Sequence, residues 1–465
     1  MNKAIITAFG FFLFHLFLAY YFELIDDEAY YNLWSSSISF GYYDHPPMIA
    51  WWIYAGKFVF GETVIGVRIL TCVAFFLVSI LIARIAFLIG GRDRILMSVL
   101  LFNIMVPVMG LGFISTPDAP LILFWTSAFW ATLEGLFNKN PWYWLLVGFF
   151  AALAILSKFN ALFYILGLFA WCIFSKRGRG ELGSPFIWMG VAIGLLILSP
   201  SIYWNYENDW IGLEKQFGRL LNKTVGLYFL FEFLLSIVIF ATPLVFIFAV
   251  LGFFKKYEFR SLVLWLHLPI LFYFLNHSLT ERIQGNWMII IFPWLAILTG
   301  LGLQNLHKFW SNLTVFLGSF LTISVLIIGM NPYVVVFSGD NSFNQMRGWE
   351  RIKPEFQAHL KMAEWVAVTD YAMIGRVSWL LGSSSKVWAL NEPHRYLFRD
   401  SFPSRLCNVP GILVEKINLK SEKNVVVVEQ ADSPVVYISQ RVGETELVRY
   451  KLTRFDKVNE SEYCT

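Results

Sequence analysis

Apolar segments of similar length recur over the first 330 residues, separated by short polar segments. Each has about the 20 residues that a helix needs to cross the hydrocarbon core of a bilayer. We expect eleven membrane spans, at approximately 4–22, 62–89, 95–113, 119–137, 142–157, 160–175, 184–203, 227–253, 261–276, 287–306 and 311–330. The number is approximate because some segments run together. The first segment lacks a small-residue cleavage site, which predicts an anchor.

The pattern changes after residue 330. Residues 340–465 are charged and mixed, with strand-like runs at 386–390 and 424–429 and a helix-like stretch at 355–368. We therefore expect two domains: a transmembrane domain of residues 1–330 and a small α/β domain of residues 331–465.

Composition supports a polytopic membrane protein. The chain of 465 residues is 57% hydrophobic and 15% charged, whereas soluble domains are about 25% charged. The net charge of +4 is small. The sequence has no internal repeat, no glycine-rich phosphate loop and no nucleic-acid-binding signature, so we expect neither a nucleotide nor a nucleic acid as a partner.

Positive charges are concentrated in alternate loops, which predicts the orientation. By the positive-inside rule these loops are cytoplasmic. They contain Arg92 and Arg94; Lys139; Lys176, Arg177 and Arg179; Lys255, Lys256 and Arg260; and Lys308. The N-terminus is then cytoplasmic, and the first loop and the domain after residue 330 lie outside.

Two of the four cysteines lie in this outer domain. An oxidising compartment would permit a disulfide between Cys407 and Cys464. Two unpaired thiols are the alternative, because spacing alone does not fix pairing.

The first outer loop begins with the acidic run Asp26-Asp27-Glu28 and is rich in Trp and Tyr. Residues 26–58 are too polar to cross the membrane, so we expect short interfacial helices. A carboxylate at this position, with Asp27 favoured, can act as a general base or bind a metal ion. The alternative is a helix N-cap, which suits Asp26 better than Asp27.

The same loop continues with Tyr43-Asp44-His45-Pro46-Pro47, which predicts a turn. His45 could donate a hydrogen bond to a phosphate, and Asp44 could orient His45 or bind a metal. Asp44 and His45 leave a divalent metal open, but two ligands are fewer than such a site needs. A turn aspartate beside a surface histidine is the alternative.

Further polar residues lie in the later outer loops. Asp118, between two prolines, could reach the cavity beside Asp27 or cap the following helix. Lys158 lies between two apolar runs, where it could meet a lipid phosphate or extend to the headgroups. Arg282 could bind phosphate in a bidentate manner, and three neighbouring side chains could hold a sugar. These are Gln284, Asn286 and Trp287.

The combined order of these motifs resembles bacterial glycosyltransferase family 39, membrane enzymes of the GT-C type related to protein O-mannosyltransferases and to the lipid A aminoarabinose transferase. The resemblance covers most of residues 1–330. It implies a polyprenyl-phosphate sugar donor, transfer on the periplasmic side of the bacterial inner membrane, a catalytic aspartate at Asp27 and a second important one at Asp118. The aminoarabinose transferases carry Glu-Lys-Pro-Pro where this chain has Asp44-His45-Pro46-Pro47, which implies a different sugar or acceptor.

The expected function is therefore transfer of a sugar from a polyprenyl phosphate to an envelope glycolipid such as lipid A or lipopolysaccharide core. Lys158, Arg282 and His45 would stabilise the phosphate. Alternatives are a protein acceptor, a transporter or lipid flippase, and a non-catalytic assembly protein. A transporter would place its charges near the bilayer midplane, often in paired repeats.

Overall fold

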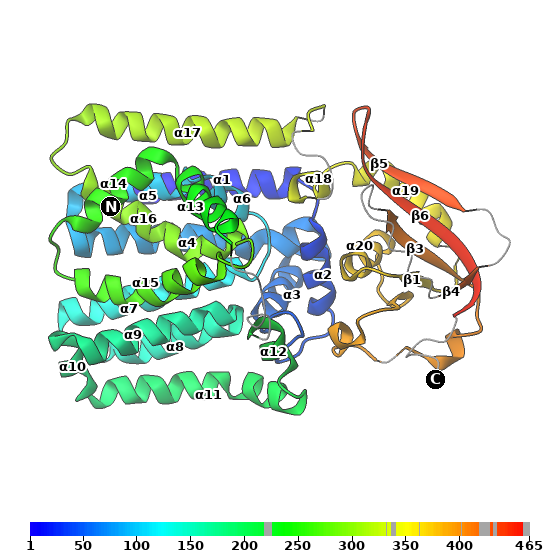
Figure 1. Cartoon of the computed structure of the whole chain (residues 1–465), viewed down its shortest axis with the longest axis horizontal. Coiled ribbons are helices and arrows are strands. Elements are labelled where there is room, and N and C mark those ends of the chain that lie inside the picture. The colour runs from blue at the N-terminus through cyan, green and yellow to red at the C-terminus, as the bar shows by residue number, and fades with distance from the viewer. Residues whose placement is uncertain are drawn as a thin grey trace. The chain divides into compact units, whose positions relative to one another are not determined.

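The computed structural model describes residues 1–217, 226–331, 333–335, 341–361, 363–400, 402–417, 428–430 and 435–458 (Figure 1). Contacts divide the chain into two compact units. The helical unit contains Met1–Leu18, Asp44–Ile49 and Arg68–Val325, and the mixed unit contains Ala19–Tyr43, Ala50–Val67 and Leu326–Thr465. The domain boundary at residue 330 stays a prediction, and the two units cut across it.

Every predicted span has a helical counterpart, so the polytopic helical class is confirmed. The long or paired helices are α1 (Asn2–Tyr21), α4 (Val64–Gly90), α5 (Ile95–Asn103) with α6 (Val106–Leu111), α7 (Asp118–Asn138), α8 (Tyr143–Ser157), α9 (Leu162–Phe174), α11 (Pro185–Glu207), α13 (Tyr228–Ala241) with α14 (Pro243–Phe254), α15 (Arg260–His277), η4 (Gly285–Ile291) with α16 (Phe292–Gly302), and α17 (Lys308–Met330). In the described part of the chain, six helices are long and apolar enough to cross a membrane, or up to eight if each of two bent pairs is one span.

The structure adds two details of the helical unit that the hydropathy pattern did not predict. The segment predicted as one span at 227–253 bends by 97° between α13 and α14. Thr242 has a φ of 70°, and Pro243 starts the new helix without a backbone N–H to continue the old one. The residues of the predicted cytoplasmic loop that contains Lys176 form a short helix, α10 (Lys176–Leu182), which follows α9 at 104°. Ser175 caps it by accepting a hydrogen bond from the Gly178 amide.

Glycines let helices of the helical unit approach closely. A Cβ on Gly252 of α14 would lie 1.9 Å from the carbonyl oxygen of Leu298 on α16, and a Cβ on Gly302 would lie 1.9 Å from that of Phe248. A Cβ on Gly148 of α8 would meet the carbonyl of Gly190 on α11 in the same way. Small residues at crossings are the usual means of tight packing between membrane helices.

The mixed unit contains the predicted α/β region. Its sheet has the order β2-β1-β3-β6-β4, with β5 paired to β6. Strand β1 is parallel to β2 and β3, and the other pairs are antiparallel. The strands are β1 (Val366–Val368), β2 (Val387–Ala389), β3 (Gly411–Ile417), β4 (Val428–Gln430), β5 (Val436–Val442) and β6 (Thr445–Val458).

The strand predicted at 386–390 is β2. Of the strand predicted at 424–429, residues 424–427 lie outside the described residues, and the rest begins β4. The helix predicted at 355–368 is partly wrong: α19 (Trp349–Leu360) ends early and β1 follows. All three residues of β1 are buried between two partner strands, and this pairing overrides the helical pattern.

The first outer loop forms two short helices, as predicted: α2 (Asp26–Ser35) and α3 (Met48–Phe60). Helix α2 packs against α20 (Tyr371–Leu381) within the mixed unit. Cys407 is disulfide-bonded, while Cys72 and Cys172 are free. Its candidate partner, Cys464, lies outside the described residues.

Candidate functional site

Asp118 is the centre of a buried polar cluster in the helical unit. Its Oδ1 accepts a 2.8 Å bond from Nζ of Lys158, and its Oδ2 accepts a 2.7 Å bond from the Asn286 amide. The Thr116 hydroxyl donates to the same Oδ2 at 3.4 Å. Asp118 is 1% and Lys158 8% exposed. Three predicted site residues from separate loops are thus brought together.

Local backbone structure explains how these residues converge. Asp118 opens α7, directly after the turn at 115–117. Lys158 has an extended conformation (φ −160°, ψ 137°) between α8 and the short helix η2 (Phe159–Ala161), so its side chain leaves the helical path. Asn286 lies in the first turn of η4.

The alternative roles considered for Asp118 and Lys158, a helix cap and extension to the headgroups, are both wrong. Pro117 is the N-cap of α7, and no side-chain cap hydrogen bond is formed there. Lys158 does not extend to the headgroups, because its side chain is buried against Asp118. In the described part of the chain, Asp118 is the one polar partner of the Lys158 ammonium. An ammonium has three N–H groups, so this cation can bind a further anion.

His45 lies within the electrostatic reach of Lys158. Burial, with the positive charge of Lys158, lowers the pKa of His45 to about 3. The imidazole is therefore neutral at physiological pH, and any contact with a phosphate would be an N–H hydrogen bond without an ionic contribution. Its neighbour Asp44 receives a 2.8 Å hydrogen bond at its backbone oxygen from Gln216 of α12 (Ile211–Phe217).

Asp44 and His45 do not form a binding site for a divalent metal in the described structure. Among the described residues, no group of three or more His, Cys, Asp or Glu side chains could hold a metal ion. Asp44 and His45 remain two adjacent residues, fewer than the three ligands that such a site needs. Asp44 and His45 alone therefore do not fit a divalent metal.

The loop at 281–287 is only partly directed to the cluster. Asn286 reaches Asp118, but Arg282 pairs at 2.5 Å with Glu232 of α13, with 67% of its side chain exposed. In the described structure Arg282 is thus paired with Glu232 and not with the Asp118–Lys158 cluster, and its contact with a phosphate stays a prediction. Gln284 accepts a 3.2 Å hydrogen bond from the indole of Trp287, which orients both side chains.

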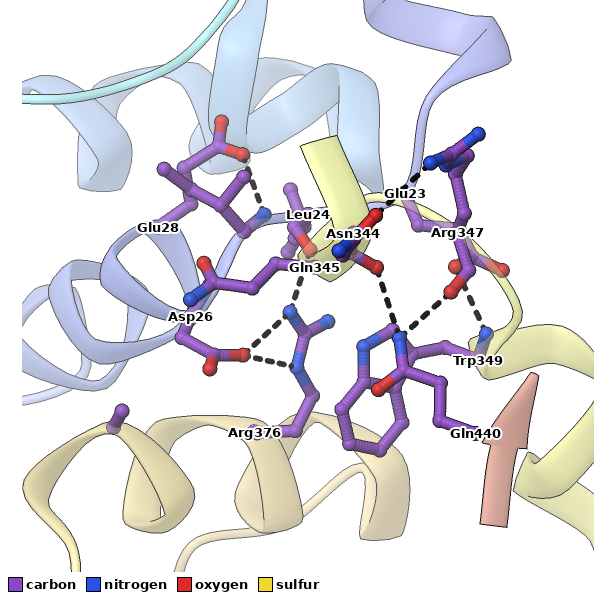
Figure 2. A network of polar contacts seen from close by, with 12 residues as sticks. Glu23, Leu24, Asp26, Glu28, Asn344, Gln345, Arg347, Trp349, Arg376 and Gln440 are labelled. Carbon is purple, nitrogen blue, oxygen red and sulfur yellow. Dashed lines mark hydrogen bonds and ion pairs between the residues drawn. The ribbon is translucent and has the colours of Figure 1, made fainter. Parts of the chain in front are cut away.

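The acidic run of the first loop belongs to the mixed unit, where its three carboxylates have different surroundings. Figure 2 shows two of them, Asp26 beside Arg376 and Glu28 at the Ile25 amide. Asp26 is buried between Arg376 and Lys416. Glu28 is fully buried and accepts a 3.0 Å bond from the Ile25 amide. Asp27, between them, is partly exposed.

The N-cap alternative for Asp26 is wrong, because Ile25 occupies the N-cap position of α2. Burial alone would raise the pKa of Asp26, but Arg376 and Lys416 outweigh it and lower the pKa below its usual range. Tyr43 is half-buried in the same unit, with the guanidinium of Arg395 at 5.4 Å from its ring centre. The shared cavity of Asp27 and Asp118 stays a prediction.

Sequence reasoning missed several buried cations, among them Arg68, Arg376 and Lys416. Arg68 in α4 is fully buried, 5.4 Å from the Phe113 ring centre. It lies inside the predicted span 62–89, so the rule that intramembrane charges are functional or paired could have identified it. No local signal marks Arg376 or Lys416, because their partner is more than 300 residues away.

Comparison with known proteins first defines the class. ArnT from Cupriavidus metallidurans, in a crystal structure bound to undecaprenyl phosphate, superposes with a TM-score of 0.70 at 13% identity over 97% of both chains. The Archaeoglobus fulgidus oligosaccharyltransferase superposes with a TM-score of 0.52 at 11% identity, covering 85% of this chain and 64% of that one. The fold is therefore of the GT-C type.

The predicted family resemblance is confirmed at the level of sequence. Residues 44–204 match the family described as dolichyl-phosphate-mannose-protein mannosyltransferase. The lipid A galacturonosyltransferase RgtD of Rhizobium johnstonii is 23% identical over 273 residues. The match spans 57% of this chain and 57% of that relative.

Proposed function

We propose that the protein is a glycosyltransferase of the bacterial inner membrane, which moves one sugar from a polyprenyl phosphate to an acceptor on the periplasmic side. The observation that carries the proposal is the buried Asp118–Lys158–Asn286 cluster, which holds a cation inside the helical unit. Undecaprenyl phosphate, bound by ArnT in its crystal structure, has the chemistry to occupy it. The relative named for lipid A supports lipid A or lipopolysaccharide core as the acceptor.

The reaction needs one proton acceptor and one stabilised leaving group. An acceptor hydroxyl attacks the anomeric carbon, the bond from that carbon to the phosphate oxygen breaks, and the polyprenyl phosphate leaves. Asp27 takes the hydroxyl proton, because it is the partly exposed carboxylate of the acidic run. The Lys158 ammonium stabilises the charge that develops on the phosphate.

The other residues orient these two groups. Asp118, which already accepts hydrogen bonds from three donors, is proposed to hold Lys158 rather than to take a proton. His45 supplies a neutral N–H toward the phosphate. Gln284 and Trp287 are proposed to contact the sugar, while Arg282 is paired with Glu232.

The class is tested with purified protein in liposomes and a panel of sugars on undecaprenyl phosphate. We expect Asp27→Asn to bind the donor as the wild type does and to lose at least about 100-fold in transfer, the usual contribution of a general base. Undiminished transfer would remove Asp27 from the mechanism. Failure of the wild type to bind any polyprenyl phosphate would overturn the class.

The role of Lys158 is tested without leaving a buried charge unpaired. The double variant Asp118→Asn/Lys158→Met removes both charges together, so its melting temperature should stay near that of the wild type. We expect transfer to fall by about 100- to 1,000-fold, the range for losing one preorganised electrostatic contact. Lys139→Ala, in an exposed loop, is the control. Wild-type transfer by the double variant would exclude a role for Lys158.

The description of the matching family favours a second acceptor class, a protein hydroxyl group. Mass spectrometry of lipid A and of envelope glycoproteins from a deletion strain separates the two. Loss of a sugar from lipid A supports the glycolipid acceptor, and loss from glycoproteins supports the protein acceptor.

A further inference from the structure

Helix α2, which carries Asp27, is fixed from the C-terminal part of the chain within the mixed unit (Figure 2). The guanidinium of Arg376 on α20 donates to Asp26 Oδ1 from Nε at 3.1 Å and from Nη2 at 2.8 Å. Nη2 also donates to the Leu24 carbonyl at 2.6 Å. Nζ of Lys416 on β3 donates to the other oxygen, Asp26 Oδ2, at 3.1 Å. Arg376 is 1% and Asp26 3% exposed.

A second set of contacts holds the segment that leads into α2. The Glu23 carboxylate accepts hydrogen bonds from the amides of Trp349 and Glu350 at 3.0 and 2.9 Å, at the start of α19. The Asp26 amide donates to the Gln345 side chain at 3.2 Å. Arg376 also lies over the Trp349 ring at 4.5 Å. The C-terminal part of the chain therefore contacts the start of α2 on both sides of Ile25, at Glu23 and Leu24 before it and at Asp26 after it.

The backbones of α2 and α20 are in direct contact at Gly375. A Cβ at this position would lie 2.4 Å from the Tyr30 nitrogen and 2.6 Å from the Ala29 oxygen. Such distances are below any real contact, so α2 cannot keep its place if Gly375 is replaced. Gly375 precedes Arg376, so the close approach and the ion pair come from the same turn of α20.

These contacts fix the direction of Asp27. Its two neighbours in the sequence, Asp26 and Glu28, are both buried and bonded, and successive residues of a helix point about 100° apart. A general base must be held within hydrogen-bond reach of its substrate, and small displacements cost much of the rate.

We propose that Arg376, assisted by Lys416, is a positioning residue for Asp27, so that the C-terminal region is a part of the catalytic framework. This inference rests on the proposed function. Arg376 does not touch the substrate in this proposal; it acts through Asp26 and the Leu24 carbonyl. The guanidinium donates to one carboxylate oxygen from two nitrogens, Nε and Nη2, and Nη2 also reaches the Leu24 carbonyl. A lysine ammonium has a single donor nitrogen and does not reproduce this rigid planar geometry.

The main test compares Arg376→Lys with Arg399→Lys in liposomes. Arg399 is a matched control: it lies in the same unit and donates to the carbonyls of Val387 and Ser384 at 3.0 and 2.8 Å. We expect Arg376→Lys to lower kcat at least about 10-fold with an unchanged KM for the donor, because a displaced base slows chemistry and not binding. Arg399→Lys should keep the wild-type kcat, whatever its melting temperature.

A second variant displaces α2 without changing any charge. Gly375→Ala should also lower kcat at unchanged donor KM, while Gly180→Ala, where a Cβ meets no heavy atom within 4 Å, should not. Wild-type kcat in both Arg376→Lys and Gly375→Ala overturns the positioning role. So does an equal loss in Arg376→Lys and Arg399→Lys, since that would reflect folding alone.

Asp27→Asn, measured in parallel, separates this inference from the proposed function. Retained transfer in Asp27→Asn refutes the catalytic assignment itself. Lost transfer in Asp27→Asn with unaffected Arg376→Lys and Gly375→Ala refutes only the positioning role.

Discussion

At the scale of single residues, adjacent side chains of the same chemistry have different surroundings in this chain. The sequence identifies Asp26, Asp27 and Glu28 as a group beside a membrane span, and Asp118 and Lys158 as isolated charges between apolar runs. Which carboxylate of the group is buried could not be predicted, because the deciding partners are separated from it by up to 390 residues. The Asp118–Lys158 pair was more accessible to prediction, since a charge at such a place needs a counter-charge.

The neutral state of His45 predicts a pH dependence of stability. The folded-state pKa of about 3 lies below the value of about 6.5 in an unfolded chain. The contribution of neutral His45 to the free energy of unfolding is therefore fully present above pH 6.5. This contribution is lost as the pH falls from there toward 3, by about 2 kcal/mol at pH 5. We expect the melting temperature of His45→Gln to fall less between pH 7 and pH 5 than that of the wild type.

Thermal unfolding in detergent, followed at both pH values, measures this difference. His307→Gln, which replaces an exposed imidazole, should behave as the wild type does. An equal fall in melting temperature between pH 7 and pH 5 for His45→Gln and the wild type would show that the fold does not keep His45 neutral.

At the scale of helices and strands, prediction was accurate where one strong signal decides the outcome. All eleven apolar segments coincide with helices, because burial of a long apolar run in a bilayer dominates other preferences. Prediction was inaccurate where backbone geometry or distant pairing decides. The bend at Thr242–Pro243 and the strand β1 depend on a positive φ and on partner strands, which hydropathy does not record.

The glycine contact between α14 and α16 predicts a local sensitivity. We expect Gly252→Ala to destabilise the protein by about 1–3 kcal/mol, the usual cost of overpacking, because the new methyl group meets the Leu298 carbonyl at 1.9 Å. Thermal melting of the purified variant measures the effect against Gly180→Ala, whose methyl group enters open space. Equal melting temperatures would mean that the two helices can separate without cost.

At the scale of the whole molecule, charge distribution is the basis for orientation. The lysines and arginines of alternate loops predict that the β5–β6 turn is periplasmic and that the short helix η1 (Arg92–Arg94) is cytoplasmic. We expect a membrane-impermeant maleimide to label Glu444→Cys in spheroplasts and Asp93→Cys only after permeabilisation. Both residues are exposed, so accessibility within the fold is comparable. The opposite pattern would place the proposed reaction on the cytoplasmic side.

The attachment of α2 to α20 also has a consequence for the order of synthesis. Asp26 leaves the ribosome early, whereas Arg376 follows 350 residues later. At translation rates of 5–20 residues per second this interval is roughly 20 to 70 s. During that time the helix that carries Asp27 lacks Arg376 and Lys416, the partners that position it in our proposal, so a nascent chain would transfer sugar more slowly until this segment is made. Under the proposed function, synthesis of the segment that carries Arg376 and Lys416 would itself be the step that activates the protein.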